Sequence, residues 1–142
     1  MTADADRPGI FRIKRVYEPA EPTDGYRVLV DRLWPRGVSK ERAALGQWLR
    51  DVAPSTGLRR WFHHDPSLMD EFTARYRAEL DANPSAVQAL LDLVHKYPVV
   101  TLLYSAHDHE DNQAVVLQAY LREALPSRRG PDPRSRSRLP PG

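Results

Sequence analysis

The sequence predicts a compact α/β domain of three layers, with a small, mainly parallel central sheet and flanking helices. Two continuous apolar runs, Val28–Val30 and Val99–Tyr104, are typical of strands that are buried on both faces. Each run is followed by a polar loop and then by apolar residues with helical spacing. This repeated strand–loop–helix order favours parallel strands joined by helices.

The length and composition fit one domain between two polar tails. Apolar residues make up 41% of the 142 residues, which is enough for a modest core. We expect residues 1–8 and 126–142 to be disordered, because they contain too few apolar groups to offset the entropy cost of ordering. A single domain over residues 9–125 remains. The tail 126–142 holds five arginines and one acid, so the formal charge of +2 divides into +4 in the tail and −2 elsewhere.

Several classes of protein are excluded by what the sequence lacks. It has no cysteine, and therefore no disulfide, thiolate nucleophile or thiolate-bound metal. No apolar run approaches the roughly 20 residues that span a bilayer, and the first residues do not resemble a signal peptide. We therefore expect a soluble, cytoplasmic protein without a membrane partner. Since no glycine-rich phosphate loop is present, we expect no NAD or ATP cofactor.

The first two structural segments are predicted to be strands. In residues 10–17 charged side chains interrupt the apolar ones on both faces, which indicates a strand near the edge of the sheet. Residues 26–33 have a continuous apolar centre, which indicates a strand covered on both faces. Only eight residues join the two segments. An antiparallel pair and a short crossover without a helix are both compatible with this length.

Four helical segments follow, and most begin with a recognisable capping signal. Ser39 is a suitable N-cap, and Asp65-Pro66 and Asn83-Pro84 place proline in a first helical turn. The predicted segments cover residues 39–52, 58–62, 65–80 and 83–94. After the buried strand 99–104, the acids in 108–111 suit the first turn of a last helix that continues to residue 125.

Polar residues follow both buried strands, and they are the main candidates for a site. They are Asp31, Arg32, Trp34 and Arg36 after the first strand, and Ser105, His107, Asp108 and Asn112 after the second. In open α/β sheets, ligands bind beyond the carboxyl ends of the strands. Arginine binds phosphate and carboxylate groups through paired hydrogen bonds. The sequence therefore predicts a crevice for a small anionic ligand, into which Arg36 points together with Asp108 or Asn112.

Two other interpretations of these residues remain open. In the first, Asp31 forms an internal ion pair with Arg32 or Arg36 and only stabilises the loop, so that the domain is a structural or interaction module. In the second, the crevice is an active site, for which Asp108 is the weak candidate for a general base. The sequence identifies no reaction, and it does not indicate an oligomeric state.

Other motifs give weaker signals. A metal site at His107–Asp111 is not expected, because two histidines two residues apart point together only on a strand. Ser105 lacks the flanking glycines of a nucleophile elbow. The basic tail, together with Arg59, Arg60 and Trp61 beside His63-His64, suggests binding to nucleic acid as an alternative function. Trp61 and its neighbour Phe62 are more commonly core residues, so this alternative is not favoured.

Four blocks, in order along the chain, resemble the YeaO-like proteins, a bacterial domain of unknown function. The blocks are DGYRVLVDRLWPRGVSK, WLRDVAPSTGLRRWFHHDP, EFTARYRAEL and VVTLLYSAHDHEDNQAVVLQAYL, within residues 10–124. The resemblance implies a small cytoplasmic α/β domain and no established activity. Members of the family usually have Ala-Lys-Asp where this chain has Ala106-His107-Asp108. This difference makes His107 a weaker candidate than the arginines, Asp31, Asp108 and Asn112.

Overall fold

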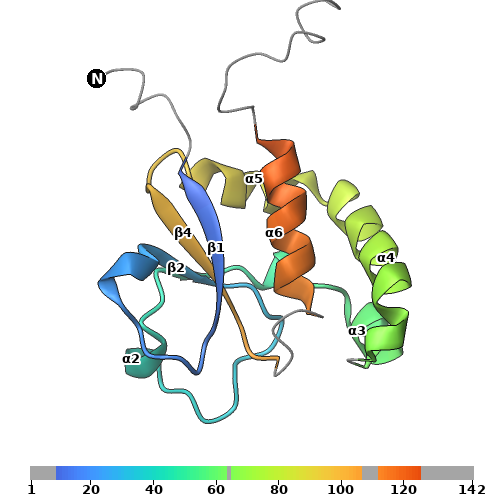
Figure 1. The fold of residues 1–142 in the computed structure, drawn as a ribbon, viewed down its shortest axis with the longest axis horizontal. Coiled ribbons are helices and arrows are strands. Elements are labelled where there is room, and N and C mark those ends of the chain that lie inside the picture. The colour runs from blue at the N-terminus through green and yellow to red at the C-terminus, as the bar shows by residue number, and fades with distance from the viewer. Residues whose placement is uncertain (1–8, 64, 107–111, 126–142) are drawn as a thin grey trace, which may run out of the picture.

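The computed structural model describes residues 9–63, 65–106 and 112–125, which form an α/β domain around one parallel sheet (Figure 1). Its strands are β1 (Ile10–Arg15), β2 (Tyr26–Leu29), β3 (Gln47–Trp48) and β4 (Val99–Tyr104). They lie in the order β1-β4-β2-β3, and every pairing is parallel. The predicted fold class is therefore confirmed, and all four carboxyl ends lie at the same edge of the sheet.

Strand β4 lies between β1 and β2, which are consecutive in the sequence. Ile10 is paired with Val99 and Tyr26 with Val100, so both neighbours run parallel to β4. The antiparallel alternative for β1 and β2 is therefore wrong. Their connection instead contains a 3₁₀ turn, η1 (Pro22–Asp24). Strand β1 lies at an edge of the sheet, as its mixed side chains predict.

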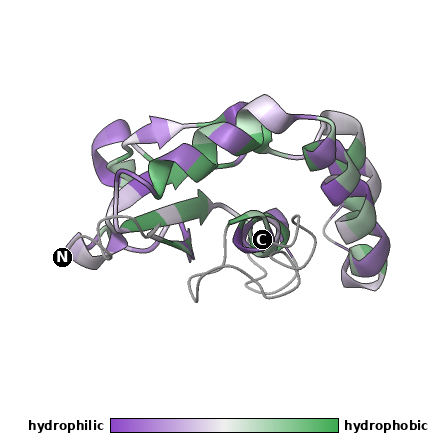
Figure 2. Ribbon diagram, turned by 90° about the horizontal axis from the view of Figure 1, so that it is seen from above, coloured by the Kyte–Doolittle hydropathy of each residue, from purple (hydrophilic) through white to green (hydrophobic). Residues whose placement is uncertain are grey.

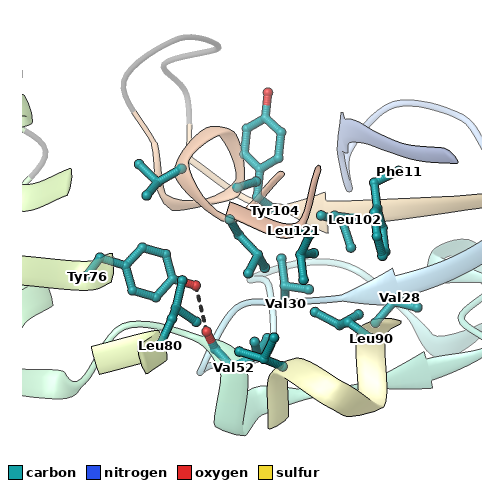
Figure 3. Packing of buried hydrophobic residues seen from close by; sticks show 14 of the residues in the cluster. Phe11, Val28, Val30, Val52, Tyr76, Leu80, Leu90, Leu102, Tyr104 and Leu121 are labelled. Atoms are coloured by element: carbon teal, nitrogen blue, oxygen red, sulfur yellow. Dashed lines mark hydrogen bonds between the residues drawn. The ribbon is translucent and has the colours of Figure 1, made fainter. Parts of the chain in front are cut away.

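Four helices form one layer against the sheet: α3 (Thr56–Phe62), α4 (Met69–Asp81), α5 (Pro84–Leu93) and α6 (Gln113–Ala124). Val28 of β2, Val30 just after β2 and Leu102 of β4 belong to the main hydrophobic core together with residues of these helices (Figure 3). Fully buried Tyr76 donates a hydrogen bond of 2.6 Å from its hydroxyl to the carbonyl of Val52. Figure 2 shows long hydrophobic stretches in the sheet, whereas the helices show both hydrophobic and hydrophilic segments.

The opposite face of the sheet is covered by a thinner layer. The single-turn helix α2 (Lys40–Ala43) and the loops around it contribute to a smaller core. The members of this core are Val16, Leu29, Val38, Ala43 and Leu103, with Tyr17, Trp34, Leu45 and Trp48 packed against it. Because Leu29 and Leu103 alternate in the strands with residues of the main core, the sheet is the middle layer of three.

The prediction of one helix over residues 39–52 is wrong. Ser39 caps α2 as expected, but the helix ends at Ala43, and the C-cap residue Ala44 has a left-handed backbone with φ of 49°. Gly46 then lies against the Tyr26 ring, where a Cβ atom would come within 2.3 Å of a ring carbon. The close approach lets the chain pair β3 with β2, and the 3₁₀ turn η2 (Arg50–Val52) follows. The apolar residues interpreted as a helical stripe are divided between these short elements.

The remaining helices begin close to their predicted starts. Ser55 caps α3, Asp65 caps the 3₁₀ turn η3 (Pro66–Leu68) before α4, and Pro84 is the first residue of α5. Helix α6 begins at Gln113, so the acids expected in its first turn precede it, outside the described residues. Within the part of the chain that the structure describes, none of the helices combines the length and apolar character needed to cross a membrane.

Candidate functional site

A cavity of about 900 Å³ lies at the carboxyl edge of the sheet. Its walls come from the residues that end or follow β1, β2 and β4, from the segment between η2 and α3, from α3 itself, and from single residues of α4 and the start of α6. This position follows from the topology, because the connections leave neighbouring parallel strands in different directions at their carboxyl ends. The cavity lies at the edge of the sheet where the sequence predicts a ligand crevice, and it is lined by more segments than the two strand ends alone.

Arginine is the dominant charged residue in the cavity wall. The wall contains Arg15, Arg32, Arg36, Arg59 and Arg60. Among the lining residues that the structure describes, Asp31 is the single carboxylate, so these residues carry an excess of four positive charges when His63 is counted as neutral. Like charges in a partly enclosed space repel one another, and a bound anion would relieve that repulsion.

Two of the five arginines are held in place by backbone carbonyl groups. Arg15 donates from Nε to the carbonyl of Ala106 at 2.8 Å and from a terminal nitrogen to that of Ser105 at 3.2 Å. Arg32 donates from Nε to the carbonyl of Pro54 at 3.1 Å and from a terminal nitrogen to that of Ala53 at 3.2 Å. These bonds fix the guanidinium planes without neutralising their charge. Each group keeps further N–H donors for a ligand.

The other three arginines are exposed, and their guanidinium groups make no hydrogen bond or ion pair with the described residues. None of the hydrogen bonds or ion pairs within the described residues uses the guanidinium group of Arg36, Arg59 or Arg60. The backbone that carries Arg36 is nevertheless anchored, since its carbonyl accepts a bond of 2.9 Å from the Tyr17 hydroxyl. The adjacent Gly37 has φ of 76°, a conformation that favours glycine. Arg36 is therefore an exposed cationic group on an anchored loop at the cavity.

Asp31 is buried in the cavity wall and is held by neutral groups. One carboxylate oxygen accepts from the Ser105 backbone N–H at 2.9 Å and from its hydroxyl at 2.7 Å. The other accepts from the Gln113 carboxamide. The alternative interpretation, in which Asp31 forms an ion pair with Arg32 or Arg36, is wrong, because Asp31 belongs to none of the ion pairs found in the described ranges.

The environment of Asp31 disfavours its ionised form. Burial is the main influence and raises the pKa above the ordinary value for aspartate. The hydrogen bonds from Ser105 and Gln113, and the positive charge of Arg59, lower the pKa and offset only part of that effect. The carboxyl group links the ends of β2 and β4 to the start of α6, so it ties three walls of the cavity together.

The candidates from the second strand end have separate positions. Ser105 lies in the cavity wall, where its polar atoms hold Asp31. Asn112 is fully buried and is not among the lining residues; its side-chain oxygen caps α6 by accepting from Ala114 at 2.8 Å and Val115 at 3.1 Å. His107 and Asp108 lie outside the described residues, as does the proposed approach of Arg36 to Asp108.

Among the cavity residues that the sequence analysis does not single out are Arg15 and Gln113, and two others, Arg59 and Arg60, are assigned there to a different site. Arg15 ends β1, so the rule that pointed to Asp31 would have included it once β1 was known to run parallel. Gln113 was overlooked because the last helix was expected to begin earlier. Arg59 and Arg60 were assigned to a possible surface for nucleic acid, but both line the cavity.

The aromatic residues beside these arginines do not form an open stacking surface. The Arg75 guanidinium lies 4.2 Å from the centre of the Trp61 ring, so one face of that ring is covered. Phe62 is buried and stacks on Phe72 with ring centres 4.2 Å apart, which confirms its expected place in the core. Among the residues that the structure describes, no group of three or more histidines and acids could hold a metal ion.

Comparisons with known proteins agree on one family. The family model described as "Inactive DUF488-N3 subclade" matches residues 10–139. The uncharacterized protein YeaO of Escherichia coli K12 is 48% identical over 112 residues, which cover 79% of this chain and 96% of YeaO. An uncharacterized protein of Mycobacterium tuberculosis is 43% identical over 107 residues, which cover 75% of this chain and 90% of that protein. No solved structure matches the chain. The chain therefore belongs to the YeaO-like family, a domain of unknown function within the DUF488 group.

Proposed function

We propose that this protein binds a small anionic ligand, carrying phosphate or carboxylate groups, in the arginine-lined cavity. One observation carries the proposal: five arginines from three separate segments converge on a cavity whose described lining residues include one carboxylate. Arg15 and Arg32 are oriented in advance by backbone carbonyls, and the other three have no committed partner within the described ranges. A charge-assisted hydrogen bond contributes about 1.5–3 kcal/mol, so three or four of them would support specific binding.

A purely structural role explains the same arginines less well. In a stabilising network the arginines would be paired with carboxylates, because arginines that lie close together without carboxylates repel one another and do not stabilise the fold. Asp31 accepts its hydrogen bonds from Ser105 and Gln113 instead. The guanidinium groups of Arg36, Arg59 and Arg60 make no hydrogen bond or ion pair within the described residues, and Arg59 acts on Asp31 only through its positive charge. Arginines that are gathered but unpaired are the expected arrangement when the partner is a ligand.

The proposal is for binding without turnover. The description of the matching family model contains the word "Inactive", which favours binding over catalysis for this chain as well. Asp31, the lining carboxylate, is occupied in joining three walls of the cavity, so it is poorly suited to leave its partners during a reaction. In this proposal Asp31 supports the wall, and the arginines contact the ligand.

The test is a thermal-shift screen of the full chain against small anions at constant ionic strength. Phosphate, sulfate, citrate and chloride are compared for the wild type, for Arg36→Ala and Arg59→Ala, and for Arg50→Ala as a control. Arg50 is exposed and packs on Trp48, outside the lining of the cavity. A ligand at 100 times its Kd stabilises the folded state by about 2.7 kcal/mol.

We expect multivalent anions to raise the melting temperature of the wild type and the control, and to have a weaker effect on the two cavity variants. Equal shifts in all four proteins would mean that the anions act outside the cavity. The absence of any anion-specific shift in the wild type would contradict the proposed function.

A further inference from the structure

We infer that the ligand carries two or more linked phosphate groups attached to an apolar body, as a nucleoside diphosphate does. This inference rests on the proposed function and deepens it. Three features support it: the size of the cavity, the number and origin of its arginines, and an exposed leucine in its wall.

The cavity is too large for one small anion. Its volume of about 900 Å³ lies near the upper end of the roughly 300–1,000 Å³ found for organic ligand sites. A water molecule occupies about 30 Å³ in the liquid, and a phosphate ion displaces only a few waters. A single phosphate would therefore leave most of the cavity filled with water, whereas an organic phosphate ester would fill it.

The cavity also contains more arginines than one phosphate group needs. A guanidinium fork that binds a phosphate in the bidentate manner uses two of its oxygens, so about two forks satisfy one group. Arg15 comes from the end of β1, Arg32 and Arg36 from the loop after β2, and Arg59 and Arg60 from α3. Because the cationic groups come from three different segments, a chain of linked phosphates can meet more of them than one phosphate can.

An apolar side chain stands beside these charges. Leu33 is 61% exposed and lines the cavity between Arg32 and Trp34. Within the described ranges, the other large hydrophobic residue exposed to a comparable degree is Ile10, which is absent from the lining. A leucine left in water next to cationic groups is suited to cover the apolar part of a ligand whose phosphates the arginines hold.

The absence of a glycine-rich phosphate loop does not conflict with this ligand class. Such a loop binds phosphates through backbone N–H groups. Here the donors are side chains, and two of them, Arg15 and Arg32, are oriented by their bonds to carbonyl groups. In this cavity, oriented guanidinium groups would therefore bind the phosphates in place of backbone N–H groups.

Isothermal titration calorimetry of the full chain tests the inference. The probes are inorganic phosphate, pyrophosphate, adenosine and adenosine diphosphate at one ionic strength, each with the wild type, Arg59→Ala and Leu33→Ser. Leu33 is exposed and belongs to neither hydrophobic core, so Leu33→Ser should leave the fold unchanged. Circular dichroism of each variant verifies that it is folded.

We expect pyrophosphate to bind at least about tenfold more tightly than phosphate, which corresponds to 1.4 kcal/mol. Adenosine diphosphate should bind more tightly again. Arg59→Ala should weaken both diphosphates several-fold, and Leu33→Ser should weaken only the nucleotide.

Equal affinities for phosphate and pyrophosphate would overturn the inference while leaving the proposed function intact. If adenosine diphosphate bound no more tightly than pyrophosphate, or if Leu33→Ser did not change its affinity, the inference that the ligand has an apolar body would be overturned. If none of the anions, phosphate included, gave a binding isotherm, the proposed function itself would fail.

Discussion

Two buried aspartates stand at opposite ends of β2 and have opposite environments. Asp24, which is 2% exposed, accepts bonds from the Lys14 ammonium group at 3.0 Å and from the Arg27 guanidinium group. Asp31, which is 7% exposed, accepts bonds only from the neutral groups of Ser105 and Gln113 among the described residues. The first carboxylate is the centre of an ion-pair network, and the second lies in a wall of unpaired arginines.

The pKa values of the two aspartates move in opposite directions. Burial opposes ionisation of Asp24, but bonds from the Glu21 backbone, Lys14 and Arg27 together outweigh it and hold the pKa below the ordinary value. For Asp31 burial dominates, and the pKa is raised. A closed network of this kind stabilises the fold and leaves no charge for a ligand. The cavity arginines around Asp31 are not paired with carboxylates within the described residues, so their positive charge is available to bind a ligand.

The largest expected effect comes from breaking the closed network. Asp24→Asn removes the charge that neutralises Lys14 and Arg27, both of which are largely buried. We expect the free energy of unfolding to fall by about 3–5 kcal/mol, as for other buried ion pairs that lose one partner. Urea unfolding followed by circular dichroism measures the change. Glu21→Gln, at a largely exposed neighbour of Lys14, is the control and should cost less than about 1 kcal/mol. A loss from Asp24→Asn no larger than that of the control would show that the network is not structural.

The second prediction uses the opposite pKa shifts. Because the pKa of Asp24 is lowered on folding, its stabilising contribution is present above the unfolded value of 3.8 and is lost as pH falls through the folded pKa. The pKa of Asp31 is raised, so its contribution is present below 3.8 and is lost as pH rises through the folded pKa.

The variant Asp31→Asn should therefore gain stability relative to the wild type as pH rises from about 3 to about 7, the interval in which carboxyl groups titrate. Asparagine keeps an oxygen for Ser105, and the Gln113 carboxamide can rotate to accept its N–H. Unfolding curves of both proteins across this range give the difference. A difference that is independent of pH would show that Asp31 is not perturbed in the folded state.

The smallest effect on stability is expected from replacing Arg36, one of the exposed arginines of the cavity. Arg36 is exposed, and its guanidinium group has no hydrogen bond within the described residues. Arg36→Ala should change the free energy of unfolding by no more than about 0.5 kcal/mol in the absence of ligand. The same urea experiment decides this. A loss comparable to that of Asp24→Asn would assign Arg36 to the framework and favour the structural-module interpretation.

The sequence predicted those parts of the fold that depend on local signals. The apolar runs of β2 and β4 were found because burial on both faces requires continuous apolar residues, and Ser39 was found because the N-cap geometry favours a serine hydroxyl. The order β1-β4-β2-β3 depends on long-range pairing, which leaves no local pattern. For the same reason the spacing of Trp48 fitted a helical stripe, although this residue pairs with Leu29 in the sheet.

The candidate site was predictable to a similar extent. The rule that ligands bind at strand carboxyl ends identified Asp31, Arg32 and Arg36 in the cavity wall. The partner of Asp31 was wrong, because residue type suggested arginine whereas the packing of α6 brings Gln113 to the carboxylate. Asn112 was interpreted as a ligand donor, but its position before α6 makes it a cap.

The central claim is that the arginine-lined cavity binds an anion, and locating the anion tests it most directly. Crystals of the full chain soaked in selenate can be measured at the selenium absorption edge, where the anomalous signal identifies the ion. We predict a selenate ion within hydrogen-bond distance of at least two of the five cavity arginines, Arg15, Arg32, Arg36, Arg59 and Arg60. Selenate bound only at other surfaces, with the cavity arginines in contact with water alone, would contradict the claim.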